Sequence, residues 1–395
     1  MKGDASMKKM LILYVLGLSS LLASLSQTII TPILPNMMNQ LNTTYFWINM
    51  SISIFMFISA IMQIVYGPLV DNKGRRKIMF PTMILFVIAS IGCAFSMNIS
   101  MLLLFRALQA VGIASTSVVA ATVIGDLFEG HERGKAMGSY QMFLALGPII
   151  GPTLGGMIGG YVGVFILLAA VGVALVLATA RFLPETRPEG AVGQRFSIQN
   201  FTKIMGNRTG SALLLIGFTQ YFAFYNFLVF LPNILSYDYG LGSKQIGLVF
   251  LPMSVLLMFG SFFGGRIQTK IDPRKSLIMA CLLNLIVIIG FICLASVSLT
   301  LLILTTALYG LTAGISMPMQ TTILAEEFVL DRATAVGVYN FIRFVGMALG
   351  PVVGGLLYSD GSYGWLFGLS ALLFGIGIWI GGTKLKANRQ SAFQG

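Results

Sequence analysis

Hydrophobic residues make up 56% of this chain of 395 residues and charged residues only 10%, too few charges to coat a soluble protein of this size. The net charge of +12 would suit a nucleic-acid-binding protein, but 22 of the 25 Lys and Arg residues are spread over the two termini and alternate loops between apolar segments. Composition therefore predicts an integral membrane protein that lies in the lipid bilayer and has no nucleic-acid partner.

Apolar stretches long enough to cross a bilayer recur along the chain, and lipid requires each to satisfy its own backbone hydrogen bonds, which favours helices. The first half contains six predicted helices: Met10–Ile33, Trp47–Leu69, Ile78–Met97, Met101–Ile124, Ala136–Gly159 and Val162–Phe182. The second half contains six more: Ala212–Leu235, Gly247–Ile267, Leu277–Val297, Leu299–Leu324, Ala335–Leu357 and Gly364–Gly382. We therefore expect an all-α membrane protein with a six-helix half at residues 1–183, a linker at 184–208 and a second six-helix half at 209–395.

The basic residues predict the orientation of these helices. They occupy the N-terminus, the loops after helices 2, 4, 6, 8 and 10, and the C-terminus, while Lys244 alone lies on the other side. This positive-inside bias predicts a multi-pass protein of the cytoplasmic membrane with both termini and the linker in the cytoplasm. The first helix lacks a small-residue cleavage pattern, so we expect it to be retained. The three cysteines lie in predicted helices and indicate neither a disulfide nor a metal site, and no cofactor is expected.

A pattern of the fifth helix returns 199 positions later in the eleventh. The first copy comprises Arg133, Ala136, Gly138, Tyr140, Gly147, Gly151, Pro152, Gly155 and Gly156, and the second Arg332, Ala335, Gly337, Tyr339, Gly346, Gly350, Pro351, Gly354 and Gly355. Glycines four residues apart form a bare stripe on which another helix can pack closely. We expect Pro148 and Pro152 to kink or loosen this helix. Paired membrane halves are how many transporters are built, with the substrate site at the seam.

Four motifs follow one another along the first half. They are Gly67-Pro-Leu-Val-Asp71-Asn-Lys73-Gly74-Arg75-Arg76-Lys77, Arg106-Ala-Leu-Gln109-Ala-Val-Gly112, Gly147-Pro148-Ile-Ile-Gly151-Pro152-Thr-Leu-Gly155-Gly156 and Phe182-Leu-Pro-Glu-Thr-Arg-Pro188. In this order they resemble the major facilitator superfamily, and the glycine–proline run resembles its twelve-helix drug/proton antiporter branch. The resemblance spans the whole chain. It implies a major facilitator fold, a small-molecule substrate, and a central cavity lined by helices 1, 4, 7 and 10.

The first motif is a candidate gate. An anchoring loop needs only basic residues, whereas Asp71 is acidic, and ionisable groups at a membrane boundary usually have partners. The resemblance implies that Asp71 and Arg75 pair with Asp126 and hold an inner gate shut, while Gly67 and Gly74 permit the tight turn. The alternative is a positive-inside anchor alone. The second copy of the loop has Thr269 where Asp71 would align, so we expect the two halves to differ at the inner gate.

Arg106 and Arg343 are the only charges expected within the hydrocarbon, where one arginine costs roughly 2.5 kcal/mol or more. Arg106 is the first candidate for a substrate contact, and the alternative is a structural partner such as a backbone carbonyl or a nearby amide. Arg343 is a weaker candidate and could turn toward Tyr339 and Asn340. The other predicted substrate-binding residues are Gln109, Gln27, Thr31, Tyr221, Tyr225 and Asn226.

All 13 acidic residues fall at helix ends or in loops, and Ser26 stands where many drug antiporters carry an acid in helix 1. If protons drive transport, Asp71, Asp126 and Asp331 are the remaining candidate carriers. No Gly-x-x-x-x-Gly-Lys-Ser/Thr motif occurs, so direct ATP drive is not expected. Neither an embedded acid–base pair nor a nucleophile–base pair is evident, so the chain is not expected to be an enzyme.

The predicted function is a monomeric secondary active transporter that exports small amphipathic compounds by alternating access. Proton antiport is implied by the resemblance alone. Two alternatives stay open: a lipid or metabolite carrier on the same fold, and a membrane ligand sensor without net flux. Two embedded arginines without an embedded carboxylate predict a preference for neutral or anionic compounds over permanently cationic ones.

Overall fold

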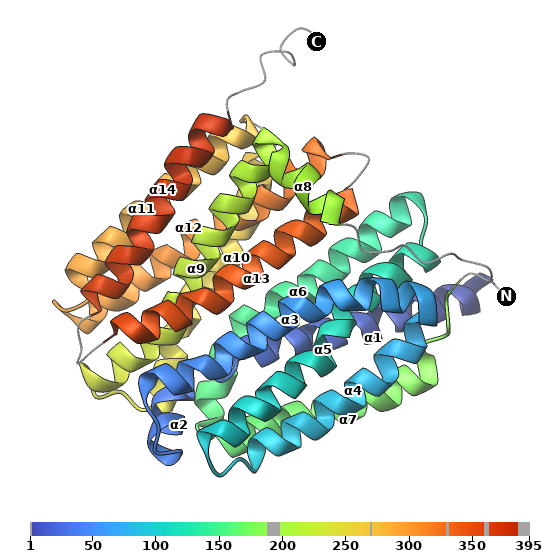
Figure 1. The fold of residues 1–395 in the computed structure, drawn as a ribbon, viewed down its shortest axis with the longest axis horizontal. Helices are drawn as coiled ribbons and strands as arrows, with labels where there is room; N and C mark the ends of the chain where they lie inside the picture. The colour runs from blue at the N-terminus through green and yellow to red at the C-terminus, as the bar shows by residue number, and fades with distance from the viewer. Residues whose placement is uncertain (1, 188–197, 269–270, 329–331, 359–362, 386–395) are drawn as a thin grey trace, which may run out of the picture. The chain divides into compact units, whose positions relative to one another are not determined.

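The computed structural model describes residues 2–187, 198–268, 271–328, 332–358 and 363–385 (Figure 1). These residues are almost entirely helical and include no strand. Within them, 12 segments are long and apolar enough to cross a membrane, judged by length and composition. The predicted all-α membrane protein with twelve spans is confirmed.

Most helices of the first half are longer than their predicted apolar cores. The helices are α1 (Lys2–Thr28), α2 (Leu34–Gln40), α3 (Tyr45–Lys73), α4 (Arg75–Ala94), α5 (Ile99–Leu127), α6 (Gly130–Ile158) and α7 (Tyr161–Phe182). The remaining helices are α8 (Ile198–Gly206), α9 (Arg208–Tyr237), α10 (Ser243–Ile267), α11 (Pro273–Leu294), α12 (Leu299–Glu327), α13 (Arg332–Leu357) and α14 (Gly364–Lys384).

The first predicted helix is broken. It was expected to run through Ile33, but α1 ends at Thr28 and a short 3-10 helix, η1 (Thr31–Ile33), leads into α2. Pro32 and Pro35 lie in the first turns of η1 and α2. Proline has no N–H to donate and clashes with the preceding helical turn, so the chain restarts its helix at each of them.

The chain forms two compact units. Unit 1 comprises Met1–Phe196 and Leu235–Leu248, and unit 2 comprises Ser197–Ile234 and Val249–Gly395. The boundaries predicted for the two halves and the linker stay a prediction.

In unit 1, α4 packs on α5 and α7, α3 packs on α5, and α1 packs on α6 (Figure 1). The glycine stripe of α6 faces α1. A Cβ atom added at Gly147 or Gly151 would overlap the side chain of Ser24 or Thr28, and one added at Gly155 would overlap the carbonyl oxygen of Ile29. The stripe therefore allows two helices to approach more closely than any larger residue would permit.

In unit 2, α11 packs on α12 and α14, and α12 packs on α13. The second glycine stripe, on α13, likewise allows close packing of two helices. A Cβ atom added at Gly346 or Gly350 of α13 would meet the carbonyl oxygens of Phe218 or Phe222 on α9. The repeat in the sequence therefore marks the same kind of close helix contact in each unit.

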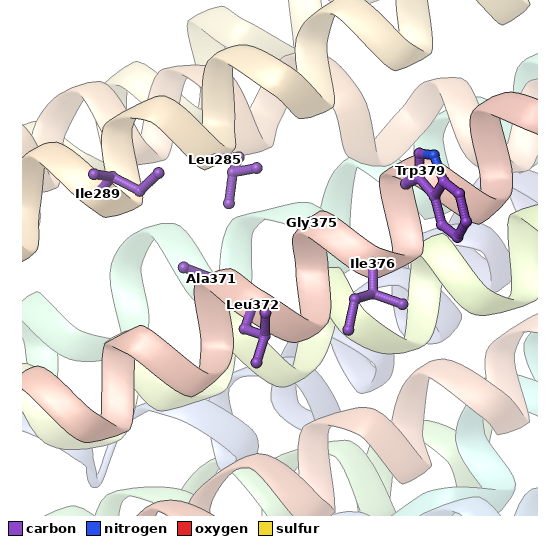
Figure 2. A pocket seen from close by; sticks show the side chains of 7 residues that line it. All are labelled: Leu285, Ile289, Ala371, Leu372, Gly375, Ile376 and Trp379. Atoms are coloured by element: carbon purple, nitrogen blue, oxygen red, sulfur yellow. The ribbon is translucent and has the colours of Figure 1, made fainter.

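An apolar groove of about 490 Å³ lies between α11 and α14 (Figure 2). Its lining residues are Leu285, Ile289, Ala371, Leu372, Gly375, Ile376 and Trp379. The indole nitrogen of Trp379 is the one side-chain polar atom among them, as Figure 2 shows. Selective sites combine an apolar wall with several placed polar groups, so this groove is not a candidate substrate site.

Candidate functional site

Arg75 joins three helices of unit 1. It begins α4, and its Nε donates a hydrogen bond to Asp126 Oδ2 near the end of α5 at 3.0 Å. Its Nη2 lies 3.7 Å from Asp71 Oδ1 near the end of α3. The side chains of Arg75, Asp126 and Asp71 are 7%, 20% and 39% exposed, respectively. Asp126 is therefore the near, shielded partner of the arginine, and Asp71 is the outer one.

A single residue, Gly74, separates α3 from α4. Its φ of +105° is a backbone conformation that residues with a Cβ rarely adopt. Gly67 lies inside α3, and an added Cβ there would meet no atom within 4 Å. The turn that was expected to need both glycines therefore depends on Gly74, and a gating role for Gly67 stays a prediction.

The segment after α7 reaches the same cluster. Glu185 Oε1 accepts hydrogen bonds from the backbone N–H of Arg75 at 2.8 Å and of Arg187 at 3.2 Å. Burial raises the pKa of Glu185, but the backbone N–H groups of Arg75, Arg187, Lys77 and Arg76 lower it, and the resulting pKa lies below the ordinary value for glutamate. Thr186 Oγ1 donates to Asp126 Oδ2 at 2.6 Å. Sequence reasoning gave these two residues no role, although their motif follows the sixth predicted helix directly.

Unit 2 contains a second arginine–carboxylate pair. Arg274 Nη2 donates to Glu327 Oε2 at 2.8 Å, and Asn207 Nδ2 donates to Glu327 Oε1 at 3.3 Å. Arg274 lies 199 positions after Arg75, which is the spacing of the sequence repeat. The carboxylate comes from the end of α12, so comparing the two loops alone did not reveal it. Thr269, on which the expected difference between the halves was based, lies outside the described residues, as does Asp331.

Arg106 of α5 is completely buried and binds two other helices of unit 1, α1 and α3. Its Nε donates to the carbonyl oxygen of Ser51 on α3 at 3.0 Å, and its Nη1 donates to that of Ser26 on α1 at 3.2 Å. Nη1 also donates to Gln109 Oε1 at 2.6 Å, and the guanidinium lies 4.1 Å from the ring centroid of Phe55. These carbonyl and amide partners are of the kind expected for a structural role. A substrate contact by Arg106 stays a prediction.

The other predicted residues of unit 1 lie close to this network along the chain. Gln109 Nε2 donates to Ser90 Oγ at 2.8 Å, which extends the network to α4. Gln27, beside Ser26, is half-buried. Thr31 is buried and donates its hydroxyl to the carbonyl of Thr28 at 2.8 Å. The hydrogen bond of Thr31 is therefore local to the end of α1.

Unit 2 contains a buried chain of polar side chains. Gln220 Nε2 donates to Ser316 Oγ, Gln320 Nε2 donates to Gln220 Oε1, and Tyr339 Oη donates to Gln320 Oε1 at 3.0 Å. The chain connects α9, α12 and α13. Tyr339, toward which Arg343 could turn by the sequence, thus donates its hydroxyl to Gln320.

Arg343 of α13 lies next to this chain of side chains and is half-buried. Its Nη1 donates to Tyr221 Oη at 3.3 Å, whereas by the sequence it could turn toward Tyr339 and Asn340. Its guanidinium lies 5.3 Å and 5.6 Å from the ring centroids of Tyr221 and Phe344. Its Nε is buried without a hydrogen-bond partner among the described residues. Arg343 and Tyr221 are thus two predicted residues that the structure brings together.

The two other predicted residues of α9 have different neighbours. Asn226 is buried and its Nδ2 donates to Ser370 Oγ on α14 at 3.0 Å. Tyr225 is 2% exposed and lies 6.0 Å from the ring of Phe224. In this structure both side chains are therefore packed within unit 2.

Residues 16–208 and 213–393 match the sequence model of the Major Facilitator Superfamily. The chain belongs to this family of membrane transporters, whose members are not enzymes.

Three relatives illustrate how far the similarity extends. The MFS antiporter QDR3 of Candida albicans is 33% identical over 184 residues, which are 45% of this chain and 26% of that protein. The multidrug transporter protein MdtP of Bacillus subtilis is 25% identical over 408 aligned positions, covering 87% of this chain and 74% of MdtP. The chloramphenicol resistance protein of Pseudomonas aeruginosa is 26% identical over 255 residues, covering 63% of this chain and 60% of that protein. The chain thus spans less than two thirds of the length of two of these relatives.

Solved structures show the same fold. A bacterial homolog of the human lysosomal transporter Spinster, in an inward-facing and unoccupied conformation, superposes with a TM-score of 0.75. It is 17% identical, and the match covers 96% of this chain and 94% of that one. The predicted major facilitator fold is confirmed.

Proposed function

We propose that this transporter exports small amphipathic compounds that are neutral or anionic, by alternating access driven by proton antiport. The names of its relatives, which include a multidrug transporter, an antiporter and a chloramphenicol resistance protein, support export of such compounds. The surroundings of Arg343 carry the argument for the charge of the substrate.

Among the described residues, the partners of Arg343 are a tyrosine hydroxyl and two aromatic rings, and none of them carries a negative charge at neutral pH. A cation in a low-dielectric interior is costly without a counter-charge, and its buried Nε has a hydrogen-bond donor to offer. A carboxylate or another electron-rich oxygen of a ligand would lower both costs. A permanently cationic ligand would raise the electrostatic cost of the buried arginine. We therefore propose Arg343 and Tyr221 of unit 2 as polar residues of the substrate site.

The two arginine–carboxylate pairs are the proposed gates. Arg75 with Asp126, and Arg274 with Glu327, each join the beginning of one helix to the end of another. We propose that these pairs form in the state that is closed to the cytoplasm and separate when it opens. Asp126 is the proposed site of proton exchange, because protonation of its carboxylate would weaken its bond to Arg75 directly.

The orientation follows from charge. We propose that the transporter lies in the cytoplasmic membrane as a monomer, with both termini in the cytoplasm. Single-cysteine labelling in intact cells, on a background without native cysteines, tests the orientation. An impermeant maleimide should label a cysteine at position 360 and spare one at position 195. The reverse result would refute the proposed orientation.

Transport into liposomes tests the proposed function. The purified protein is reconstituted with chloramphenicol, fluorescein or tetraphenylphosphonium as a neutral, anionic or cationic probe, and a pH gradient is imposed. We expect the gradient to drive chloramphenicol and fluorescein, and Arg343→Gln to reduce fluorescein transport more than chloramphenicol transport. Gradient-driven transport of tetraphenylphosphonium that Arg343→Gln leaves unchanged would contradict the proposal.

A further inference from the structure

The segment after α7 contacts both of the helices that carry the proposed gate of unit 1. Glu185 Oε1 accepts a hydrogen bond from the backbone of Arg75 at the start of α4, at 2.8 Å. The next residue, Thr186, donates to the carboxylate of Asp126 near the end of α5, at 2.6 Å. Two adjacent residues thus bind both members of the Arg75–Asp126 pair.

No side chain of the adjoining residues caps the start of α4. Its N-cap residue is Gly74, and the backbone N–H of Arg75 donates to an acid that lies 110 residues further along the chain. The corresponding helix of unit 2, α11, is capped locally, because Asp272 Oδ1 accepts from the backbone N–H of Arg274 at 2.8 Å and of Lys275 at 3.1 Å. The start of α4 therefore depends on a distant segment of its own unit for a contact that α11 receives from the adjacent Asp272.

The geometry around Gly74 provides room for this contact. A Cβ atom added at Gly74 would overlap the carboxylate of Glu185, so a larger residue there would displace this contact and also strain the backbone at its φ of +105°. A further bond lies alongside: Arg76 Nη2 donates to the carbonyl oxygen of Ala180 in the last turn of α7, at 2.7 Å. Side chain and backbone thus fix the end of α7 and the segment after it to the beginning of α4.

We propose that Glu185 and Thr186 are positioning residues of the gate, so that the start of the linker and the Arg75–Asp126 pair move together. The functional part of this proposal rests on the gating role proposed above. Its structural part does not depend on what the protein carries. Displacement of the linker would then loosen the ends of α4 and α5 at the same time, although neither Glu185 nor Thr186 contacts substrate.

Hydrogen–deuterium exchange of the full-length protein in lipid nanodiscs tests the proposal without a substrate. In Glu185→Ala we expect the backbone amides of residues 75–77 to exchange about fivefold faster, as for loss of a helix cap. We also expect faster exchange at residues 124–128 at the end of α5. Thr186→Val, which keeps the side-chain shape and loses the donor, should accelerate exchange at both helix ends as well. The conservative variants Glu185→Gln and Thr186→Ser keep an acceptor and a donor, and should restore most of the protection.

Two results would overturn the proposal. If Glu185→Ala accelerates exchange at residues 75–77 alone, or at neither helix end, Glu185 does not position the ion pair. The control is Asp272→Ala, which removes the local cap of α11 and should leave residues 75–77 and 124–128 unchanged. Faster exchange there in the control would indicate general destabilisation and would also overturn the assignment. If the variants behave as expected but Asp126→Asn transports at the wild-type rate, the gating proposal is wrong and the positioning contact stands.

Discussion

Asp126→Asn should impair the transporter far more than Asp71→Asn. Asp126 accepts hydrogen bonds from Arg75 at 3.0 Å and from Thr186 at 2.6 Å. Hydrogen bonds to a charged group contribute about 1.5 to 3 kcal/mol each. The asparagine oxygen retains part of this, and the carboxylate side chain is 20% exposed, so we expect a loss of about 2 to 3 kcal/mol in the state where the pair is formed. At about 1.4 kcal/mol per factor of ten, the population of that state falls roughly 30- to 150-fold.

The Asp71 pair is weaker for two reasons. Its atoms are 3.7 Å apart and the aspartate side chain is 39% exposed. Exposed ion pairs contribute about 0 to 1 kcal/mol, which is at most about a fivefold change in population. Asp71→Asn is therefore the matched control: an acid-to-amide change next to the same arginine.

Turnover in liposomes, with ligand affinity measured separately on the purified protein, separates the two effects. Asp126→Asn should reduce the chloramphenicol exchange rate by tenfold or more while its affinity changes less, because a shift between states removes no ligand contact. Asp71→Asn should reduce the rate about fivefold at most. Equal losses in the two variants, or a wild-type rate for Asp126→Asn, would refute the reasoning.

Three further predictions concern Glu327, Gly155 and Arg106. Glu327→Gln should slow exchange in the same assay, because it weakens the bond from Arg274 at 2.8 Å; a wild-type rate would exclude a gate in unit 2. Gly155→Ala should lower the free energy of unfolding by about 1 to 3 kcal/mol, because the added Cβ overlaps the Ile29 carbonyl. The control is Gly134→Ala, whose added Cβ meets no atom within 4 Å, and it should leave the free energy of unfolding equal or slightly higher. Thermal unfolding of the two variants distinguishes these outcomes. Arg106→Ala should lower the free energy of unfolding by about 1 to 3 kcal/mol, and the melting temperature with it, because it leaves buried carbonyls and Gln109 without their donor. A normally stable Arg106→Ala variant that loses only anion transport would instead favour a substrate contact.

The membrane architecture could be predicted because lipid imposes a strong rule on the chain. A segment that crosses hydrocarbon must be apolar and must close its own backbone hydrogen bonds, so twelve helices could be read from composition. The break after Thr28 was less evident, although Pro32 and Pro35 both signal it. Their apolar neighbours made the stretch read as one continuous span.

The candidate site could be predicted where its partners meet an obvious chemical need, or where the family resemblance implied them, as for Asp126 beside Arg75. A buried Arg106 needs carbonyl or amide partners, and the structure shows partners of both kinds. That the carbonyls belong to Ser51 and Ser26 depends on how the helices pack, which the sequence does not show. The Arg274–Glu327 pair was missed because the acid lies 53 residues away on another helix. The contacts of Glu185 and Thr186 were missed for the same reason, since they join residues 110 and 60 positions apart. Local patterns carry no information about such contacts.

Counterflow in liposomes tests the central claim of transport most directly. Chloramphenicol, fluorescein and tetraphenylphosphonium are first ranked by the rise in melting temperature that each gives the purified protein, since a ligand of the native state stabilises it. Liposomes loaded with the best ligand unlabelled are then diluted into the same compound with a radioactive label. A carrier that exchanges internal for external substrate will accumulate the label transiently above its external concentration, and the account predicts this for the neutral or the anionic compound. A compound that raises the melting temperature but shows no transient accumulation would contradict the account and identify a membrane ligand sensor instead.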